Sequence, residues 1–339
     1  MPVWAKRILA FVLSVLLLLP VLTGCKSKED IEGTKPAPTE PAEEAKVLKI
    51  LTLGHSLTVD ACHMLNMVAH TEGYEHLLVG TLYYSGCPLS KHVQFLTRDE
   101  PAYNLYLSST ERPTAAPDIT DGVTMKYALT YEYWDIIIMQ GATFDTAESE
   151  TYTNGDIQTI QEYVKKHIVN PNFKFAWHMP WALPVDRDLQ LTKENDSVHK
   201  NYAAYDHNRS KFFAAMTKCV DDHIMTDETF DFLIPTGTAV ENALSSYKEE
   251  KDLHRDYGHG SDFSCLIAAY VYFCCVTGKD HLDEIKVDVV PQQFFRRPNG
   301  LQKWELTDHE KELILESVNN ALKAPLQMTQ SKFTEKPTE

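Results

Sequence analysis

The chain has 339 residues, of which 43% are hydrophobic and 24% charged, an ordinary composition for a globular protein. Its 48 acidic and 32 basic residues give a formal net charge of −16. Phosphate backbones and anionic lipid headgroups attract clustered Lys and Arg, so this balance argues against nucleic acid as a partner and against docking on an anionic lipid surface.

The first 24 residues have the pattern of a bacterial lipoprotein signal peptide. Lys6 and Arg7 precede an apolar run at 8–22 that is too short and wrongly flanked for a transmembrane helix. The tetrapeptide LTGC, which ends at Cys25, then resembles a lipobox. We expect cleavage before Cys25, acyl chains such as palmitate on its thiol, and a lipid-anchored location in the cell envelope, at the outer membrane or cell surface. An ordinary signal peptide followed by a chance cysteine is the alternative.

A polar segment separates this leader from the folded part. Residues 25–45 would comprise the lipidated cysteine and a flexible tether, because this proline-containing stretch has too few apolar residues to form a core. We expect one folded domain at 46–324 and a loose polar tail at 325–339. Three further cysteines, Cys265, Cys274 and Cys275, lie in an apolar helical stretch, so we expect buried thiols there rather than disulfides.

The folded part opens with an apolar run at 47–53, and such a run predicts a buried strand. Four similar runs follow, at 77–83, 134–139, 173–179 and 232–234. Helical patterns accompany them, at 57–68, 125–129, 155–168, 199–220, 263–274 and 307–322. This alternation predicts an α/β domain with a mostly parallel five-stranded sheet that helices cover on both faces.

Chemically useful residues follow the predicted strands, where parallel sheets place their ligand sites. Gly54-His55-Ser56 follows the first strand and opens a helix. A serine at such a turn is held at the rim of the sheet, and its N–H lies at a helix start, where a developing oxyanion is favoured. A serine that only caps the helix is the alternative.

The next two strands end in groups that can donate hydrogen bonds. Gly86 follows the second strand and can present a bare backbone N–H, while Gln140 ends the third with a side-chain amide. Both groups could stabilise an oxyanion. The alternatives are a simple turn at Gly86 and an unremarkable polar strand end at Gln140.

Trp177, His178 and Trp181 lie at the end of the fourth strand. Two indoles near a site could stack on sugar rings, so we include these residues in a candidate substrate-binding set. Partly buried core aromatic residues are the alternative.

Asp256 and His259 lie three residues apart on a predicted loop before a helix. A histidine can take the proton of a serine as general base, while an aspartate orients its ring and stabilises the imidazolium. Two alternatives are a metal site that uses His254, Asp256 and His259, and a surface histidine without a role.

Taken together, these segments resemble the SGNH/GDSL hydrolase superfamily, and most closely a bacterial lipoprotein branch described as a domain of unknown function (DUF4886-like). The resemblance spans about 47–280 and rests on six blocks in order: GHSLTVDA, SGCPL, WDIIIMQGAT, WHMPWA, PTGTAVENA and HRDYGHGSDFS. It implies a three-layer α/β/α, flavodoxin-like fold.

The resemblance also assigns roles residue by residue. Ser56 matches the nucleophile, and Gly86 matches the glycine that would line the oxyanion hole together with the Ser56 N–H. Asp256 and His259 match the Asp-x-x-His pair, with His259 as base. Two positions depart from the superfamily. His55 stands where it has Asp or Asn, so we assign His55 to substrate binding, and Gln140 stands where it has Asn as the third donor.

The function implied by this resemblance is an exported serine esterase that removes an acetyl or other acyl group from a carbohydrate and needs no cofactor. Its substrate would be a glycan or small-molecule ester. One competing hypothesis is a degenerate member of the superfamily that binds glycans without catalysis, and another is the metal-dependent hydrolase. The sequence leaves the oligomeric state open.

Overall fold

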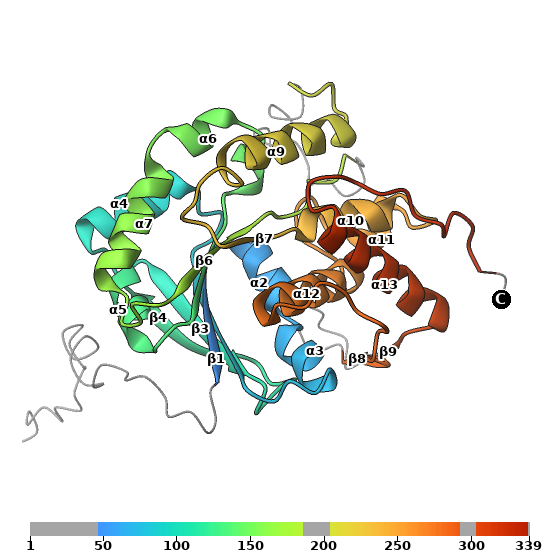
Figure 1. Cartoon of the computed structure of the whole chain (residues 1–339), viewed down its shortest axis with the longest axis horizontal. Coiled ribbons are helices and arrows are strands. Elements are labelled where there is room, and N and C mark those ends of the chain that lie inside the picture. The colour runs from blue at the N-terminus through green and yellow to red at the C-terminus, as the bar shows by residue number, and fades with distance from the viewer. Residues whose placement is uncertain (1–46, 186–203, 292–302, 338–339) are drawn as a thin grey trace, which may run out of the picture. The chain divides into compact units, whose positions relative to one another are not determined.

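A seven-stranded sheet lies at the centre of the computed structural model, which describes residues 47–185, 204–291 and 303–337 (Figure 1). Its strand order is β4-β3-β2-β1-β5-β6-β7. Five strands are parallel: β1 (Leu48–Gly54), β2 (Leu77–Tyr83), β5 (Ile136–Met139), β6 (Lys174–His178) and β7 (Phe232–Ile234). An antiparallel hairpin, β3 (Tyr103–Ser109) and β4 (Asp118–Val123), extends the sheet beyond β2.

The expected five-stranded sheet is therefore corrected to seven strands. The parallel strands were recognisable because both of their faces are buried, as Ile50 and Leu51 illustrate on opposite sides of β1. The hairpin gives a weaker signal. In β4, Val123 is the only buried residue, so the strand reads as polar sequence and not as an apolar run.

Helices cover both faces of the sheet, which confirms the three-layer α/β/α architecture (Figure 1). One face is covered by α2 (Ser56–Cys62), α3 (Leu65–Thr71) and α12 (Asp262–Thr277), with α10 (Thr236–Leu244) and α13 (Asp308–Lys323) packed on α12. The other face is covered by α4 (Leu89–Arg98), α5 (Met125–Tyr131), α7 (Asp156–His167) and α9 (Arg209–His223). The predicted helix at 57–68 is two helices, α2 and α3.

Shorter elements complete the described part. They are η3 (Thr143–Asp145), α6 (Ser149–Thr153), α11 (Glu250–Leu253) and the hairpin of β8 (Val289–Pro291) and β9 (Lys303–Glu305). No helix of the described residues is both long and apolar enough to span a membrane. The leader, Cys25 and the tether lie outside the described residues. Cys265 and Cys274 are buried free thiols, and Cys275 is a free thiol that is partly exposed.

The C-terminal segment at 325–337 packs against α10, contrary to the expectation of a loose tail. The Thr329 N–H donates to Asn242 Oδ1 at 2.7 Å, and the Tyr247 N–H donates to the carbonyl of Phe333 at 2.8 Å. Phe333 is buried. One aromatic side chain and a few backbone hydrogen bonds are enough to fix a segment whose composition is polar.

Candidate active site

Ser56 is the first residue of α2 and lies directly beyond the end of β1. The helix cap is His55, whose Nδ1 accepts from the Leu57 N–H at 3.4 Å. The serine hydroxyl is therefore not used as a cap, and within the described residues it has no hydrogen-bond partner. Ser56 is half-buried, so its hydroxyl can meet a ligand.

Gly86 belongs to the loop that follows β2, the neighbour of β1 in the sheet. Gly54 pairs with Tyr83, and the Tyr84 N–H donates to the Gly54 carbonyl at 3.3 Å, so the loop that follows β2 starts beside the turn before Ser56. Gly86 is exposed and has a φ of +58°, a conformation that favours glycine. In the described part of the chain, neither the Gly86 nor the Ser56 backbone N–H has a hydrogen-bond partner.

Asp256 and His259 form a closed pair in the loop between α11 and α12. His259 Nδ1 lies 2.9 Å from both carboxylate oxygens of Asp256. One of these oxygens, Oδ1, also accepts from the backbone N–H groups of Gly258 and His259, at 3.0 and 2.9 Å. In this arrangement the His259 Nδ1–H donates to the carboxylate, which leaves Nε2 as the basic nitrogen.

Burial alone would raise the pKa of the Asp256 carboxyl group. The hydrogen bonds from the His259 ring and from the backbone N–H groups of His259 and Gly258 outweigh that effect, and the pKa lies well below its ordinary value. Asp256 therefore remains a carboxylate in the pH range where a histidine acts as a base.

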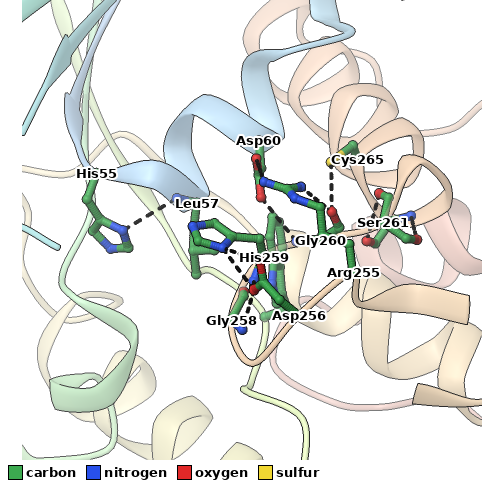
Figure 2. A network of polar contacts seen from close by, with 12 residues as sticks. His55, Leu57, Asp60, Arg255, Asp256, Gly258, His259, Gly260, Ser261 and Cys265 are labelled. Carbon is green, nitrogen blue, oxygen red and sulfur yellow. Dashed lines mark hydrogen bonds and ion pairs between the residues drawn. The ribbon is translucent and has the colours of Figure 1, made fainter. Parts of the chain in front are cut away.

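The base loop, which we define as residues 254–260, lies against the first turns of α2. Asp60 of α2 accepts from Arg255 Nη2 and from the Gly260 N–H, so this loop is bonded to the helix that begins with Ser56 (Figure 2). Ser56 and His259 do not form a direct hydrogen bond in this structure. Such contacts are often long before substrate binds and tighten in the complex.

A second group of polar side chains is fully enclosed beneath the strand ends. Gln140 Nε2 lies 3.2 Å from His55 Nε2, and Gln140 Oε1 lies 3.2 Å from His178 Nδ1 and accepts from the Thr58 hydroxyl. His178 Nε2 lies 2.7 Å from the Thr236 hydroxyl. We call His55, Thr58, Gln140, His178 and Thr236 the buried network, because all five are at most 4% exposed.

The substrate-binding set predicted from sequence is corrected by this burial. Trp177, His178 and Trp181 are 0% exposed and His55 is 4% exposed, so none of the four side chains is open to a ligand. Trp177 packs against Tyr152 and Phe230 in the core. The pattern of aromatic residues after a strand could not distinguish a rim position from a core position.

Trp181 has a different role from the one expected. Its indole Nε1–H donates to the carbonyl of Gly258 at 3.1 Å, so it supports the base loop from below.

The alternative metal site is not formed by the described residues, among which no three His, Cys, Asp or Glu side chains come together to hold an ion. His254 is buried, and its ring nitrogens face the carbonyls of Glu250 and Ala182 at 3.2 and 3.3 Å. These contacts engage both ring nitrogens within the protein.

Sequence analysis missed two features of the site. Asp60 of α2 and Arg255 of the base loop form an ion pair at 2.8 Å. Tyr83 and Tyr106 stack on each other at 5.3 Å beside a cavity that Val59, His63, Tyr106 and Ser108 help to line. Asp60 follows Ser56 by one helical turn, which was a usable signal. Tyr106 lies in the hairpin that was not predicted.

Comparison with known proteins places this arrangement in a family. The family model described as "Domain of unknown function (DUF4886)" matches residues 49–294. A solved DUF4886 family protein from Bacteroides uniformis ATCC 8492 is 21% identical and shares the fold, with a TM-score of 0.69 over 86% of this chain and 100% of that one.

Two other solved structures align less closely. A putative SGNH hydrolase from Slackia heliotrinireducens is 19% identical over 67% of this chain and 98% of its own, with a TM-score of 0.41. The acetyl xylan esterase AlAXEase is 12% identical over 68% and 100%, with a TM-score of 0.37. No curated protein matches the chain. Since the family model covers most of the sequence, the chain belongs to the DUF4886 family.

Proposed function

We propose that this protein is a serine hydrolase that cleaves carboxylic esters, with Ser56 as nucleophile, His259 as general base and Asp256 as the residue that orients His259. The observation that carries the proposal is the closed Asp256–His259 pair, which leaves Nε2 as the basic nitrogen of a ring beside the helix that begins with Ser56. An uncommitted, half-buried serine hydroxyl at that position is suited to nucleophilic attack.

The reaction would proceed in two halves. The Ser56 oxygen attacks the ester carbonyl carbon while His259 Nε2 takes the hydroxyl proton. Collapse of the tetrahedral intermediate breaks the carbon–oxygen bond to the alcohol, and His259 returns the proton to the leaving oxygen. Water then attacks the acyl-serine with His259 again as base, which releases the carboxylic acid and restores Ser56.

The oxyanion would form where backbone donors are available. The N–H groups of Ser56 and Gly86 are the two candidates, and the start of α2 adds a favourable dipole. Gln140 is the proposed third donor. Its amide already contacts three side chains of the buried network, so it would reach the oxyanion through the remaining Nε2 hydrogen.

The substrate class that we propose is an acylated carbohydrate. Support comes from the stacked Tyr83 and Tyr106, which are half-buried and adjoin the cavity beside α2. Val59 of that cavity lies one helical turn from Ser56. A partly exposed aromatic surface with hydroxyl and amide groups nearby suits a sugar ring. We also propose that the enzyme acts in the cell envelope, anchored through Cys25.

The test is hydrolysis of p-nitrophenyl acetate and of acetylated xylan by the full-length protein in detergent, compared with Ser56→Ala. We expect Ser56→Ala to lower kcat by about 10⁴-fold or more. The matched control is Ser85→Ala, a change of an exposed serine on the neighbouring loop, which should keep wild-type rates. Hydrolysis that persists in Ser56→Ala would disprove the nucleophile assignment.

A direct chemical readout complements the rates. An alkyl fluorophosphonate should add to the peptide that contains Ser56 and not to that peptide in Ser56→Ala, as measured by mass spectrometry. Labelling of another residue in the active protein would contradict the proposal.

The second candidate is a glycan-binding protein without turnover. The absence of a direct hydrogen bond between Ser56 and His259 in the described structure favours it. It predicts no Ser56-dependent hydrolysis of any acetylated glycan, together with binding of the same glycan by calorimetry.

A further inference from the structure

Asp60 connects the two halves of the candidate site. It lies on α2, four residues after Ser56, and its side chain is only 10% exposed. Its Oδ1 accepts from Arg255 Nη2 at 2.8 Å, and its Oδ2 accepts from the Gly260 N–H at 3.1 Å. Both partners belong to the base loop, which is almost 200 residues away in sequence (Figure 2).

Arg255 also forms hydrogen bonds within the base loop, to His259 and Gly260. Its Nη1 donates to the Gly260 carbonyl, and its backbone N–H donates to the His259 carbonyl at 3.1 Å. The His259 ring is thus hydrogen-bonded to Asp256, and the next residue along the chain, Gly260, is hydrogen-bonded to Asp60. A Cβ atom at Gly260 would lie 2.7 Å from Ser264 Oγ, so this position packs closely against α12 and leaves no room for a larger residue.

The ion pair is unlike an ordinary surface pair. Isolated surface pairs contribute little to stability, because water screens them and both side chains lose freedom. Here one partner is buried, both carboxylate oxygens are used, and two of the groups held are backbone atoms adjacent to His259. Such a contact fixes the position of the loop backbone next to His259. A displacement of a catalytic group by about 1 Å can lower the rate about 10²-fold.

We propose that Asp60 and Arg255 are positioning residues that hold the base loop at a fixed distance from the nucleophile helix, so that His259 stays aligned with Ser56. Neither residue touches the reacting atoms. The inference rests on the proposed hydrolase function and adds to it a device that couples the nucleophile and its base.

The first experiment measures the loop directly and needs no activity. Amide hydrogen exchange of a peptide covering the base loop is compared in wild type, Asp60→Asn and Arg255→Gln. We expect exchange of the Gly260 region to increase at least tenfold in both variants. The control is Glu132→Gln, which breaks a similarly sheltered pair with Lys49 (2.8 Å) at the opposite end of β1 and should leave the base loop unchanged.

The second experiment measures catalysis. We expect Asp60→Asn to lower kcat about 10- to 100-fold while KM stays within twofold. In a His259→Ala background, the same change should leave the residual rate unchanged, because there is no longer a base to align. General damage to the fold would instead lower the residual rate further. Arg255→Gln, made at the more exposed partner, provides the test if Asp60→Asn does not fold.

Three results would overturn the proposal. The first is unchanged hydrogen exchange of the base loop in both variants, and the second is faster exchange with an unchanged kcat. The third is a loss of kcat from Asp60→Asn that is as large in the His259→Ala background as in the wild type. A wild-type protein without Ser56-dependent hydrolysis would instead overturn the proposed function and with it the catalytic purpose of the pair. The exchange data would then still decide whether Asp60 and Arg255 hold the loop.

Discussion

Two groups of histidines lie near α2, and they differ in exposure and in partners. In the buried network, His55 and His178 are 4% and 0% exposed, and each contacts Gln140. In the base loop, the His259 side chain is 23% exposed and is paired through Nδ1 with Asp256. A histidine near a candidate nucleophile is therefore a candidate base only if one ring nitrogen is oriented by a carboxylate and the other faces solvent or ligand.

The largest expected effect separates the two groups by function. His259→Ala should lower kcat by about 10⁴-fold or more and leave the melting temperature nearly unchanged, because the residue is on a loop. His178→Ala should instead lower the free energy of unfolding by about 2–5 kcal/mol, since it leaves a cavity and breaks two buried contacts. Steady-state kinetics and thermal melts measure both. A reversal of the two effects would refute the comparison.

Acid should lower the free energy of unfolding, because the two histidines of the buried network resist protonation in the folded protein. Burial lowers the pKa of His55 to about 4 and that of His178 to about 3, from the ordinary 6.5. The unfolded chain therefore binds protons below pH 6.5 while the folded chain does not, and stability falls as the pH drops from about 6.5 toward the folded pKa values. We expect a loss of about 2 kcal/mol for each of the two histidines between pH 7 and pH 5.

Denaturant unfolding at the two pH values measures this loss. His55→Asn keeps a residue that can cap α2 and should remove one histidine's share of the pH dependence. Equal pH dependence in wild type and variant would show that His55 titrates normally.

Gln140 belongs to the buried network and is also the proposed third oxyanion donor. Gln140→Met should lower kcat by about 10²–10³-fold if the amide reaches the oxyanion, and should lower stability by about 1–3 kcal/mol through lost hydrogen bonds. Thr52→Val is a suitable control, because it removes a buried hydroxyl that bonds within the sheet. A loss of stability without a loss of kcat would restrict Gln140 to a structural role.

The smallest effect concerns support for the base loop. Trp181→Phe removes the hydrogen bond to the Gly258 carbonyl and should cost about 1 kcal/mol, with a decrease of a few fold in kcat. Trp177→Phe is the matched control: its indole Nε1 is buried without a hydrogen-bond partner among the described residues, so kcat should not change. Equal kcat in the two variants would contradict a supporting role for Trp181.

Sequence reasoning was successful where local patterns carry the information. Apolar runs identified all five parallel strands. The rule for strand ends indicated Ser56 and Gly86, and the Asp-x-x-His spacing on a predicted loop indicated Asp256 and His259, although the catalytic roles of all four stay predictions. It failed where a residue's environment depends on distant segments. The burial of Trp177 is set by Tyr152 and Phe230, and the Asp60–Arg255 pair joins residues that no local pattern connects.

The separation between Asp60 and Gly260, 200 positions along the chain, has a consequence for how the protein is made. A ribosome that adds about 5–20 residues per second needs roughly 10–40 seconds to pass from one to the other. During that interval the segment that bears Ser56 exists without His259, its proposed base. If the proposed roles hold, the site is completed late in synthesis, because the α12–α2 contact cannot form before α12 has been made.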